Sequence, residues 1–196
     1  MEIHDGSTGR TYFSKRLHRF DEDKLPRELT FSCFRRFPFL SKDRTREWFV
    51  EALENQRAKW PVDLWAWVLM TEHVHLLVAP REPGVKIGLF AGAIKEEVAS
   101  RGIRWIAKHS PEWLKKITVH EGGRTRRRFW QPGGDYDRSV DTLTTLQSMI
   151  DYIHQNPVRR GLVPRAEDWE WSNARWYAGL RPVWLEMDRT LPVFFE

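Results

Sequence analysis

Apolar and polar residues alternate with two different periods along this chain, and the period of each stretch predicts its secondary structure. A stretch in which every second residue is apolar, or a short run that is wholly apolar, is typical of a β-strand. The strands predicted in this way are residues 28–37, the apolar runs 64–69 and 74–78, and two short pieces at 117–120 and 129–131. Thr71 and Glu72 lie between the two apolar runs, so these runs are expected to form a β-hairpin.

Other stretches repeat their apolar residues at the spacing of an α-helix. They predict helices over about residues 43–58, 85–100 and 141–155, and a further short helix within 102–117. Pro157 is expected to end the last of the long helices, because the residue before a proline is pushed out of the α region. The apolar residues of that helix that are expected to face inward are Leu143, Leu146, Ile150 and Ile153.

The order of these elements predicts the fold class. Strand, helix, strand, strand, helix, strand and helix follow one another, which is typical of an α+β fold with a ferredoxin-like antiparallel sheet and helices packed on one face. With 196 residues, the chain is long enough for one domain with a buried core. Residues 1–27 are polar and basic and are expected to form an N-terminal arm, and residues 179–196 to form a C-terminal tail.

The composition excludes some classes of protein and favours others. Apolar runs stay shorter than the roughly 18 residues of a membrane span, so no membrane partner is expected. Cys33 is the single cysteine, which excludes an internal disulfide and a cysteine-built zinc site and favours the cytoplasm. The chain has 32 Lys and Arg against 27 Asp and Glu, and its pI is near 9.5.

The distribution of the arginines says more than the net charge. Four arginines fall within residues 124–128 and run directly into Phe129 and Trp130, which would suit phosphate contacts combined with base stacking. A solvated charged surface is the common alternative for such a run. The candidate nucleic-acid-binding residues are Arg35, Arg36, Arg126, Arg127, Arg128, Trp130, Arg159 and Arg160.

His73 and His75 lie in the second apolar run and are candidate metal ligands. Side chains alternate along a strand, so the two imidazoles lie on one face while Val74 and Leu76 lie on the other. Their Cα atoms are expected to lie about 6.7 Å apart, a separation at which both can bind one ion. A single His-x-His pattern is more often structural, so the pair needs a second feature before it defines a site.

Tyr152 and Asn156 supply that second feature at the end of the last long helix. Four residues separate them, so they project from one side of the helix, about 40° apart, and Ser148 continues that side. Taken alone, they could be a surface tyrosine and a helix-ending asparagine. Together with the histidines they provide two imidazole nitrogens, one amide oxygen and a phenol, a set that suits Mg²⁺ or Mn²⁺ with positions left open for phosphate. Tyrosine is a poor nucleophile at its usual pKa of about 10, and His154 projects to the other side of the helix, so no general base is evident.

At these residues the chain resembles a known family. MTEHVHLLV is similar to the H-hydrophobe-H strand of the single-tyrosine HUH transposases, and YIHQNPVRRGLV is similar to the tyrosine helix of the REP-associated tyrosine transposases. The segments FSCFRRFPFL, FWQPGGDYDRSV and WEWSNARWY follow in the same order as in that family, so the resemblance covers residues 28–178.

The resemblance implies both a fold and an activity. It implies the HUH nuclease fold over 28–178, with His73, His75 and Asn156 as metal ligands and Tyr152 as the nucleophile. Members of the family bind hairpins of repetitive extragenic palindromes (REPs) as single-stranded DNA and cleave or rejoin the strand beside the stem. Thr71-Glu72 stands where the family usually has Pro-Asn, and Arg160 stands where alanine is common. Gly-Gly-Asp-Tyr, at residues 133–136, replaces the more usual Gly-Phe-His-Asp. These departures leave open which DNA sequence is recognised.

Three functions are consistent with these residues. The first is a metal-dependent single-strand DNA endonuclease and strand transferase that forms a covalent 5′-phosphotyrosine, either a mobile transposase or a domesticated protein that processes REPs. The second is a protein that binds hairpin DNA without cutting it. The third is a zinc hydrolase built on His73 and His75, for which a third histidine or a carboxylate in a recognisable motif is missing. The sequence leaves the choice between monomer and homodimer open.

Overall fold

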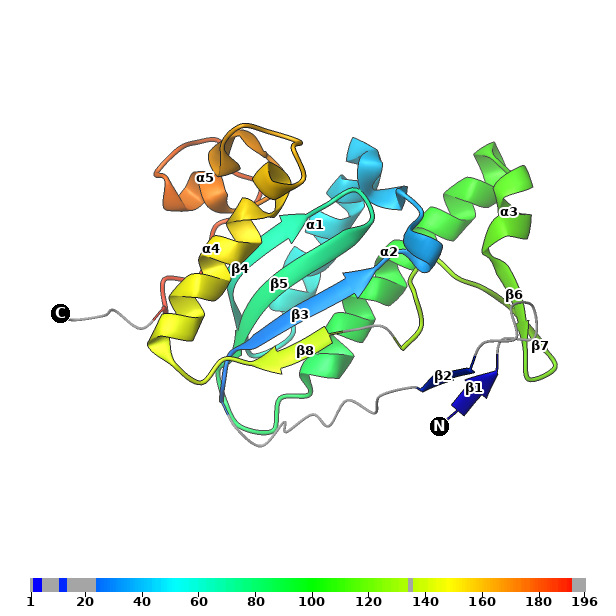
Figure 1. The fold of residues 1–196 in the computed structure, drawn as a ribbon, viewed down its shortest axis with the longest axis horizontal. Coiled ribbons are helices and arrows are strands. Elements are labelled where there is room, and N and C mark those ends of the chain that lie inside the picture. The colour runs from blue at the N-terminus through cyan, green and yellow to red at the C-terminus, as the bar shows by residue number, and fades with distance from the viewer. Residues whose placement is uncertain (1, 5–10, 14–23, 134–135, 192–196) are drawn as a thin grey trace.

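A four-stranded antiparallel sheet forms the centre of the molecule (Figure 1). The computed structural model describes residues 2–4, 11–13, 24–133 and 136–191. The strand order is β4-β5-β3-β8, so β5 pairs with β4 on one side and with β3 on the other. The bounds of these strands are β3 Arg27–Ser32, β4 Val62–Leu69, β5 His73–Pro80 and β8 Tyr136–Ser139.

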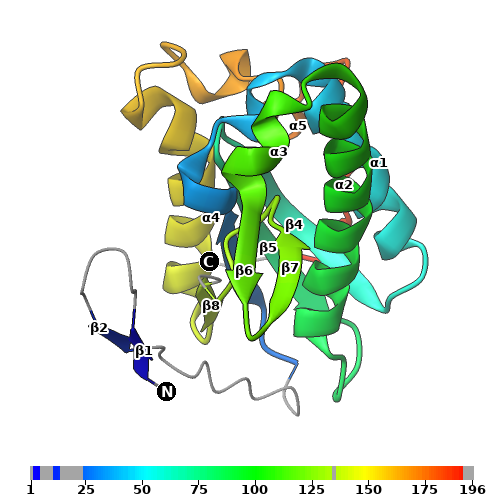
Figure 2. The ribbon, with the colours of Figure 1, turned by 90° about the vertical axis from the view of Figure 1, so that its right-hand side faces the viewer.

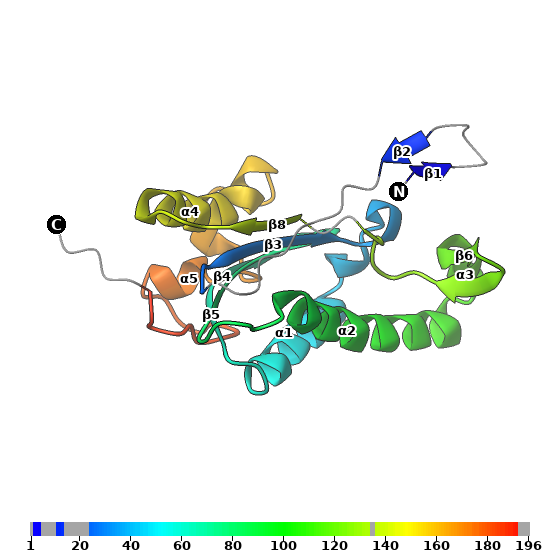
Figure 3. The same ribbon diagram turned by 90° about the horizontal axis from the view of Figure 1, so that it is seen from below.

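Helices cover the two faces of this sheet unequally (Figure 3). Helices α1 (Asp43–Arg57) and α2 (Ile87–His109) pack side by side on one face, and α4 (Leu143–Arg159) lies on the other. The order β3-α1-β4-β5-α2-β8 is that of a ferredoxin-like unit, so the predicted α+β class with an antiparallel sheet is confirmed. The prediction of helices on one face holds for α1 and α2, whereas α4 is added to the opposite face.

The position of α4 follows from the apolar runs that form the hairpin. Every residue of β4 and β5 is buried, and neighbouring residues contribute to different cores. Val74 and Leu76 pack in the core under α1 and α2, whereas Leu77 packs with Ile150 and Ile153 of α4. A strand that is apolar on both sides needs a cover on both faces, and α4 provides the second cover.

The remaining elements lie around this centre. The β6–β7 hairpin follows α3 and carries the arginine-rich segment (Figure 2), and β1 pairs with β2 near the N-terminus. Their bounds are β1 Glu2–His4, β2 Thr11–Phe13, η1 Phe34–Arg36, η2 Phe39–Ser41, α3 Glu112–Ile117, β6 Thr118–Glu121, β7 Arg124–Arg127, η3 Ala166–Asp168 and α5 Ala174–Tyr177. No helix in the described part of the chain is long and apolar enough to span a membrane.

Most of the predicted elements are present, and the differences have local causes. The strand predicted over 28–37 ends at Ser32, because the backbone turns at Arg35 and Arg36, which have φ values of 51° and 52°. The predicted strand at 129–131 is reduced to one bridge between Cys33 and Trp130, and the helix predicted over 85–100 extends to His109.

The tyrosine helix differs from its prediction at both ends. It continues through Pro157 to Arg159, and the chain then leaves the helix at Gly161, which has a φ of 67°. A proline costs a helix one hydrogen bond, and in the last turn this loss is small enough to be tolerated. Leu143, predicted to face inward, is 52% exposed, whereas Leu146, Ile150 and Ile153 are buried as predicted.

The predicted division into an arm, a domain and a tail stays a prediction, and most of residues 1–23 and all of 192–196 lie outside the described residues. At the domain's N-terminal boundary, Arg27 already belongs to β3. Packing is continuous across residue 178, because Leu185 and Met187 are buried in the core under α1 and α2. The Asp188 carboxylate accepts hydrogen bonds from the Arg57 side chain and the Leu64 backbone.

Candidate active site

His73 and His75 form the floor of a cleft between the sheet and α4. The register of β5 against β3 places His73 opposite Ser32 and His75 opposite Thr30. Both histidines lie on the α4 side of the sheet and are buried, and their ring centroids are 5.0 Å apart. The strand therefore brings the two imidazoles together as the alternation of side chains predicted.

The carboxylate of Glu72 holds the ring of His73. His73 Nδ1 lies 3.0 Å from Glu72 Oε1. Burial and, to a smaller extent, the neighbouring His75 lower the pKa of His73 to about 4, although Glu72 acts in the opposite direction. His73 is therefore uncharged at neutral pH. With the Nδ1 proton donated to Glu72, the lone pair of Nε2 is left for a metal ion.

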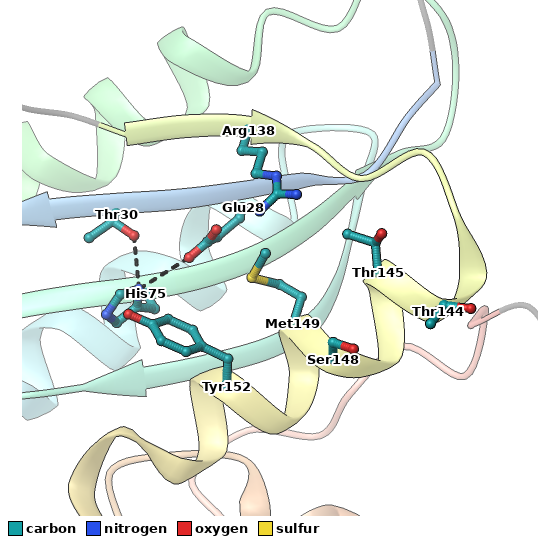
Figure 4. Close-up of a pocket in the computed structure, with 9 residues that line it drawn as sticks. All are labelled: Glu28, Thr30, His75, Arg138, Thr144, Thr145, Ser148, Met149 and Tyr152. Atoms are coloured by element: carbon teal, nitrogen blue, oxygen red, sulfur yellow. Dashed lines mark hydrogen bonds and ion pairs between the residues drawn. The ribbon is translucent and has the colours of Figure 1, made fainter. Parts of the chain in front are cut away.

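The hydroxyl of Thr30 holds the ring of His75, and Glu28 lies near the same ring nitrogen. His75 Nδ1 lies 2.8 Å from Thr30 Oγ1 and 3.5 Å from Glu28 Oε1, both from the neighbouring strand β3 (Figure 4). Histidines that bind metals usually have their second ring nitrogen fixed by such an outer partner, which orients the ring. Both histidines of this cleft have one.

Tyr152 and Asn156 enter the same cleft from α4. The Tyr152 ring lies with its centroid 5.6 Å from that of His75, and 40% of this residue is exposed. Asn156 is buried, and its Nδ2 donates a hydrogen bond of 2.8 Å to the backbone carbonyl of Tyr152. This bond uses the nitrogen of the amide and leaves its oxygen for another partner. The structure thus brings together all four residues that the sequence predicted as the catalytic centre.

The donor set of this cleft fits a divalent ion with open coordination positions. In the described part of the chain, no three His, Cys, Asp or Glu side chains cluster in the manner of a metal site. Among the described residues, Asn156 offers an amide oxygen in the same cleft as a candidate third ligand beside His73 and His75. Two imidazole nitrogens and one amide oxygen would leave coordination positions open, unlike the four protein ligands of a closed structural zinc site.

Arginines surround the mouth of the cleft. The cleft has a volume of about 380 Å³ and is lined by Thr30, Ser32, Arg36, His73, His75, Tyr152, Asn156, Arg159 and Arg160. Glu72 lies 3.7 Å from the Arg36 guanidinium and 3.5 Å from that of Arg160, and the guanidinium of Arg159 lies 5.3 Å from the Tyr152 ring centroid. Arg36, Arg159 and Arg160 therefore line the cleft, whereas Arg35 packs over Phe34 and is not among its lining residues.

Glu72 remains ionised in this setting. Burial acts to raise the pKa of Glu72, but a hydrogen bond from Thr71 and the nearby His73 and Arg160 outweigh it, so the pKa lies below its ordinary value. The carboxylate joins a candidate metal ligand, the end of the tyrosine helix and η1. In the sequence, Glu72 stands out only as a departure from the usual family residue, and no pattern indicates a role for it.

The predicted arginine-rich surface lies apart from this cleft. Arg126 and Arg127 are exposed on β7, which lies at the opposite end of the molecule from α4 in Figures 1 and 3. Arg128 is only half-exposed. The prediction that Trp130 offers a stacking surface is wrong: this residue is 7% exposed, and its Nε1 donates to the Lys95 carbonyl at 2.8 Å. Its ring packs edge-on against Phe31, with centroids 5.2 Å apart, so it belongs to the core.

The position of the tyrosine helix is fixed by a buried polar network that the sequence did not predict. His154 Nε2 lies 2.9 Å from Asn173 Oδ1, and the Asn173 side chain also bonds the backbone of Trp67 and Trp65 in β4. The hydroxyl of Tyr177 donates to the same Trp65 carbonyl at 2.9 Å. Through Asn173, the segment WEWSNARWY therefore ties His154 of α4 to β4 of the sheet.

Comparison with known proteins gives one clear relative in sequence. A protein of Haemophilus influenzae that carries the provisional name REP-associated tyrosine transposase is 24% identical over 145 residues, which cover 70% of this chain and 77% of that protein. No family model matches the chain.

The fold is shared with a solved structure described as a REP-associated tyrosine transposase bound to a REP hairpin. The two superpose with a TM-score of 0.65 at 20% identity, over 90% of this chain and 93% of the other. A provisionally named transposase from Deinococcus radiodurans gives a TM-score of 0.42 at 22% identity, over 72% of this chain and 97% of the other, which is too low to establish a common fold. The fold is thus that of a tyrosine transposase. With the sequence similarity, it confirms the resemblance to the REP-associated tyrosine transposases.

Proposed function

We propose that this protein is a metal-dependent single-strand DNA endonuclease and strand transferase that acts beside palindromic hairpins through a covalent 5′-phosphotyrosine. The observation that carries the proposal is that an exposed tyrosine, two histidines and an asparagine line one cleft together with three arginines. Each histidine has one ring nitrogen within hydrogen-bonding distance of a neighbouring side chain. The hairpin is proposed as the partner because the solved structure with the same fold is described as bound to one.

The proposed reaction uses the hydroxyl of Tyr152 as the nucleophile. Its Oη loses the phenolic proton and forms a bond to phosphorus as the bond from phosphorus to the 3′ oxygen breaks. The 3′ oxygen leaves with the electron pair and takes up a proton, so the step has no net gain or loss of protons. The 5′ phosphate stays on Tyr152, and attack by a 3′ hydroxyl later rejoins a strand and frees the tyrosine. A Mg²⁺ or Mn²⁺ ion held by His73, His75 and Asn156 would withdraw charge from the scissile phosphate.

The surrounding side chains bind and orient the substrate in this proposal. Arg36, Arg159 and Arg160 neutralise the phosphates that flank the scissile bond, since arginine pairs with phosphate oxygens through two N–H groups at once. Glu72 and Thr30 hold the two imidazoles in the orientation that the sheet sets.

Replacing Tyr152 with phenylalanine tests the nucleophile. A fluorescent hairpin oligonucleotide with a single-stranded flank is incubated with the protein and magnesium, and the mixture is separated on a denaturing protein gel. Tyr152→Phe should form no adduct and should still bind the hairpin, because only the nucleophilic oxygen is removed. Tyr177→Phe is the matched control and should keep forming the adduct, since burial raises the pKa of Tyr177 and its hydroxyl is bonded to Trp65.

The same gel separates the alternative functions. A protein that only binds hairpins would shift the oligonucleotide on a native gel and give no adduct in the wild type. A zinc hydrolase would do neither. An adduct that survives in Tyr152→Phe would show that another tyrosine is the nucleophile and would refute the assignment.

The exposed arginines of β7 are proposed as a second phosphate-binding surface. Each phosphate contact adds roughly 0.7–0.9 to the slope with which the logarithm of affinity falls against the logarithm of salt concentration. Replacing Arg126, Arg127 and Arg128 with alanine should therefore flatten this slope and weaken binding to all oligonucleotides alike. A titration of binding against salt measures the slope, and an unchanged slope would mean that these side chains face solvent in the complex.

A further inference from the structure

A second cavity adjoins the cleft of the candidate active site. It has a volume of about 640 Å³ and shares Thr30, His75 and Tyr152 with the cleft (Figure 4). From Tyr152 it extends along α4 towards the N-terminus of that helix, and its other lining residues are Glu28, Arg138, Thr144, Thr145, Ser148 and Met149. The cavity exists because α4 packs mainly on β4 and β5, so that a space remains between this helix and strands β3 and β8.

The chemistry of this cavity differs from that of the cleft. The cleft is rimmed by three arginines and suits phosphate, whereas the second cavity presents a carboxyl group, several hydroxyls and the thioether of Met149. Among the described residues that line it, Arg138 alone is an arginine or lysine. A polar group set among apolar surfaces, within a volume of 300–1,000 Å³, is typical of a site for a small organic group. A nucleobase has this character and a phosphate does not.

Glu28 is a buried acidic residue among those that line this cavity. It is 4% exposed, and its carboxyl group points into the cavity from β3 (Figure 4). Its side-chain contact within the described part of the chain is the 3.5 Å approach of Oε1 to His75 Nδ1, which is longer than a good hydrogen bond. A carboxyl group accepts hydrogen bonds from N–H and O–H donors, so Glu28 is placed to accept one from a ligand in this cavity.

We propose that this cavity holds a nucleobase next to the scissile phosphate and that Glu28 selects a base with an exocyclic amino group over thymine. The inference rests on the proposed function, because the shared Tyr152 sets the position of the base relative to the phosphate. Adenine, cytosine and guanine present amino donors that a carboxyl oxygen accepts. Thymine presents one imide N–H between two carbonyl oxygens, and these oxygens would face the oxygens of Glu28. Met149 and the ring of Tyr152 provide flat, polarisable contact surfaces for the base.

A hairpin oligonucleotide with randomised nucleotides on its single-stranded flank tests this selection. The library is bound to Tyr152→Phe protein in the presence of EDTA, so that neither cleavage nor metal binding contributes, and the bound fraction is sequenced. One flanking position should be depleted of thymine on the order of tenfold relative to the other bases, the discrimination expected of a base-specific contact. Adding Glu28→Gln should abolish this depletion, because an amide offers a donor as well as an acceptor and can pair with thymine.

Two matched controls separate base selection from damage to the catalytic centre. Glu72→Gln also replaces a carboxylate that contacts the Nδ1 atom of a histidine. Residue 72 is not among the lining residues of either cavity, so this variant should leave the base profile unchanged. Ser148→Trp should fill the cavity and flatten the base profile at the same position. Asp151→Trp is its control, because Asp151 is exposed on the same helix and lines neither of the two cavities.

The outcomes distinguish this inference from the function on which it rests. The protein with an intact Tyr152 is tested for the covalent adduct on the same library. An adduct together with a thymine depletion that survives Glu28→Gln and Ser148→Trp would overturn the inference alone. The absence of any adduct would count against the proposed function itself. Loss of the depletion in both cavity variants, with both controls unchanged, is the predicted result.

Discussion

The two faces of the central sheet are built from the same strands but differ in composition: one is apolar and the other carries buried polar side chains. Under α1 and α2, side chains such as Phe31, Trp67 and Leu76 are almost completely buried and form a continuous apolar core. Under α4, the same strands present His75 and Glu28, which are buried yet line cavities. The alternation of side chains along a strand lets one face supply the stability while the other holds polar groups that would be costly in a closed core.

The helix on the polar face is held differently from the two helices on the apolar face. Helices α1 and α2 are held by close apolar packing. Helix α4 is held by apolar contacts along one edge and by the buried bonds of His154 and Asn173. This attachment leaves the side of α4 that carries Tyr152 open to the cavities.

Replacing Trp130 with alanine should give the largest effect on stability. Trp130 belongs to the apolar face, and truncating a buried aromatic ring costs about 3–5 kcal/mol of unfolding free energy. Urea denaturation measures the loss, and Trp184→Ala, which truncates a ring that is 41% exposed, should lose much less. A Trp130→Ala protein of unchanged stability that binds DNA weakly would show instead that the ring faces the DNA, and the division between the faces would be broken.

Glu72→Gln should give the next largest effect, and it should fall on activity. Loss of an outer partner of a metal-binding histidine typically lowers metal affinity or activity by about 10- to 100-fold. Adduct formation is titrated with Mn²⁺ after treatment with EDTA, and the variant should need more than about 10 times as much metal. Glu51→Gln, which removes a carboxylate paired with Arg101 on the surface of α1, is the control and should match the wild type. Equal metal dependence in Glu72→Gln would show that the carboxylate does not orient His73.

The smallest effect should be a change in the pH dependence of stability at His154. Burial lowers the pKa of His154, so the folded protein keeps this imidazole neutral while the unfolded chain takes up a proton below about pH 6.5. The unfolded state then binds more protons, and the free energy of unfolding falls as the pH is lowered through this range. His154→Gln should reduce the fall between pH 7.5 and pH 5.5 in urea denaturation. Parallel curves for the two proteins would mean that the imidazole is not held neutral.

The predictions from sequence succeeded where the determining pattern is local. The hairpin of β4 and β5, helix α1 and the shared face of His73 and His75 follow from spacing within one element. The proximity of Tyr152 to His75 followed from the family resemblance, since the two residues lie on elements far apart in the sequence.

Other contacts between elements could not be predicted, and each error has a physical cause. Trp130 follows a run of arginines, but the bridge to Cys33 turns it into the core, and no local pattern reports such a long-range pairing. Strand β8 is short and polar, so its sequence lacks the apolar alternation of a strand. Glu28 and Thr30 meet His75 only through the register of β3 against β5, although the alternation of β3 already placed them on its polar side.

Locating the covalent attachment site is the direct test of whether Tyr152 is the nucleophile. Wild-type protein is reacted with a hairpin oligonucleotide and magnesium, digested with nuclease and protease, and its peptides are analysed by mass spectrometry. We expect a nucleotide phosphate on Tyr152 and on no other tyrosine. A nucleotide on Tyr136 or Tyr177, or an unmodified Tyr152 in protein that has cleaved the DNA, would contradict it.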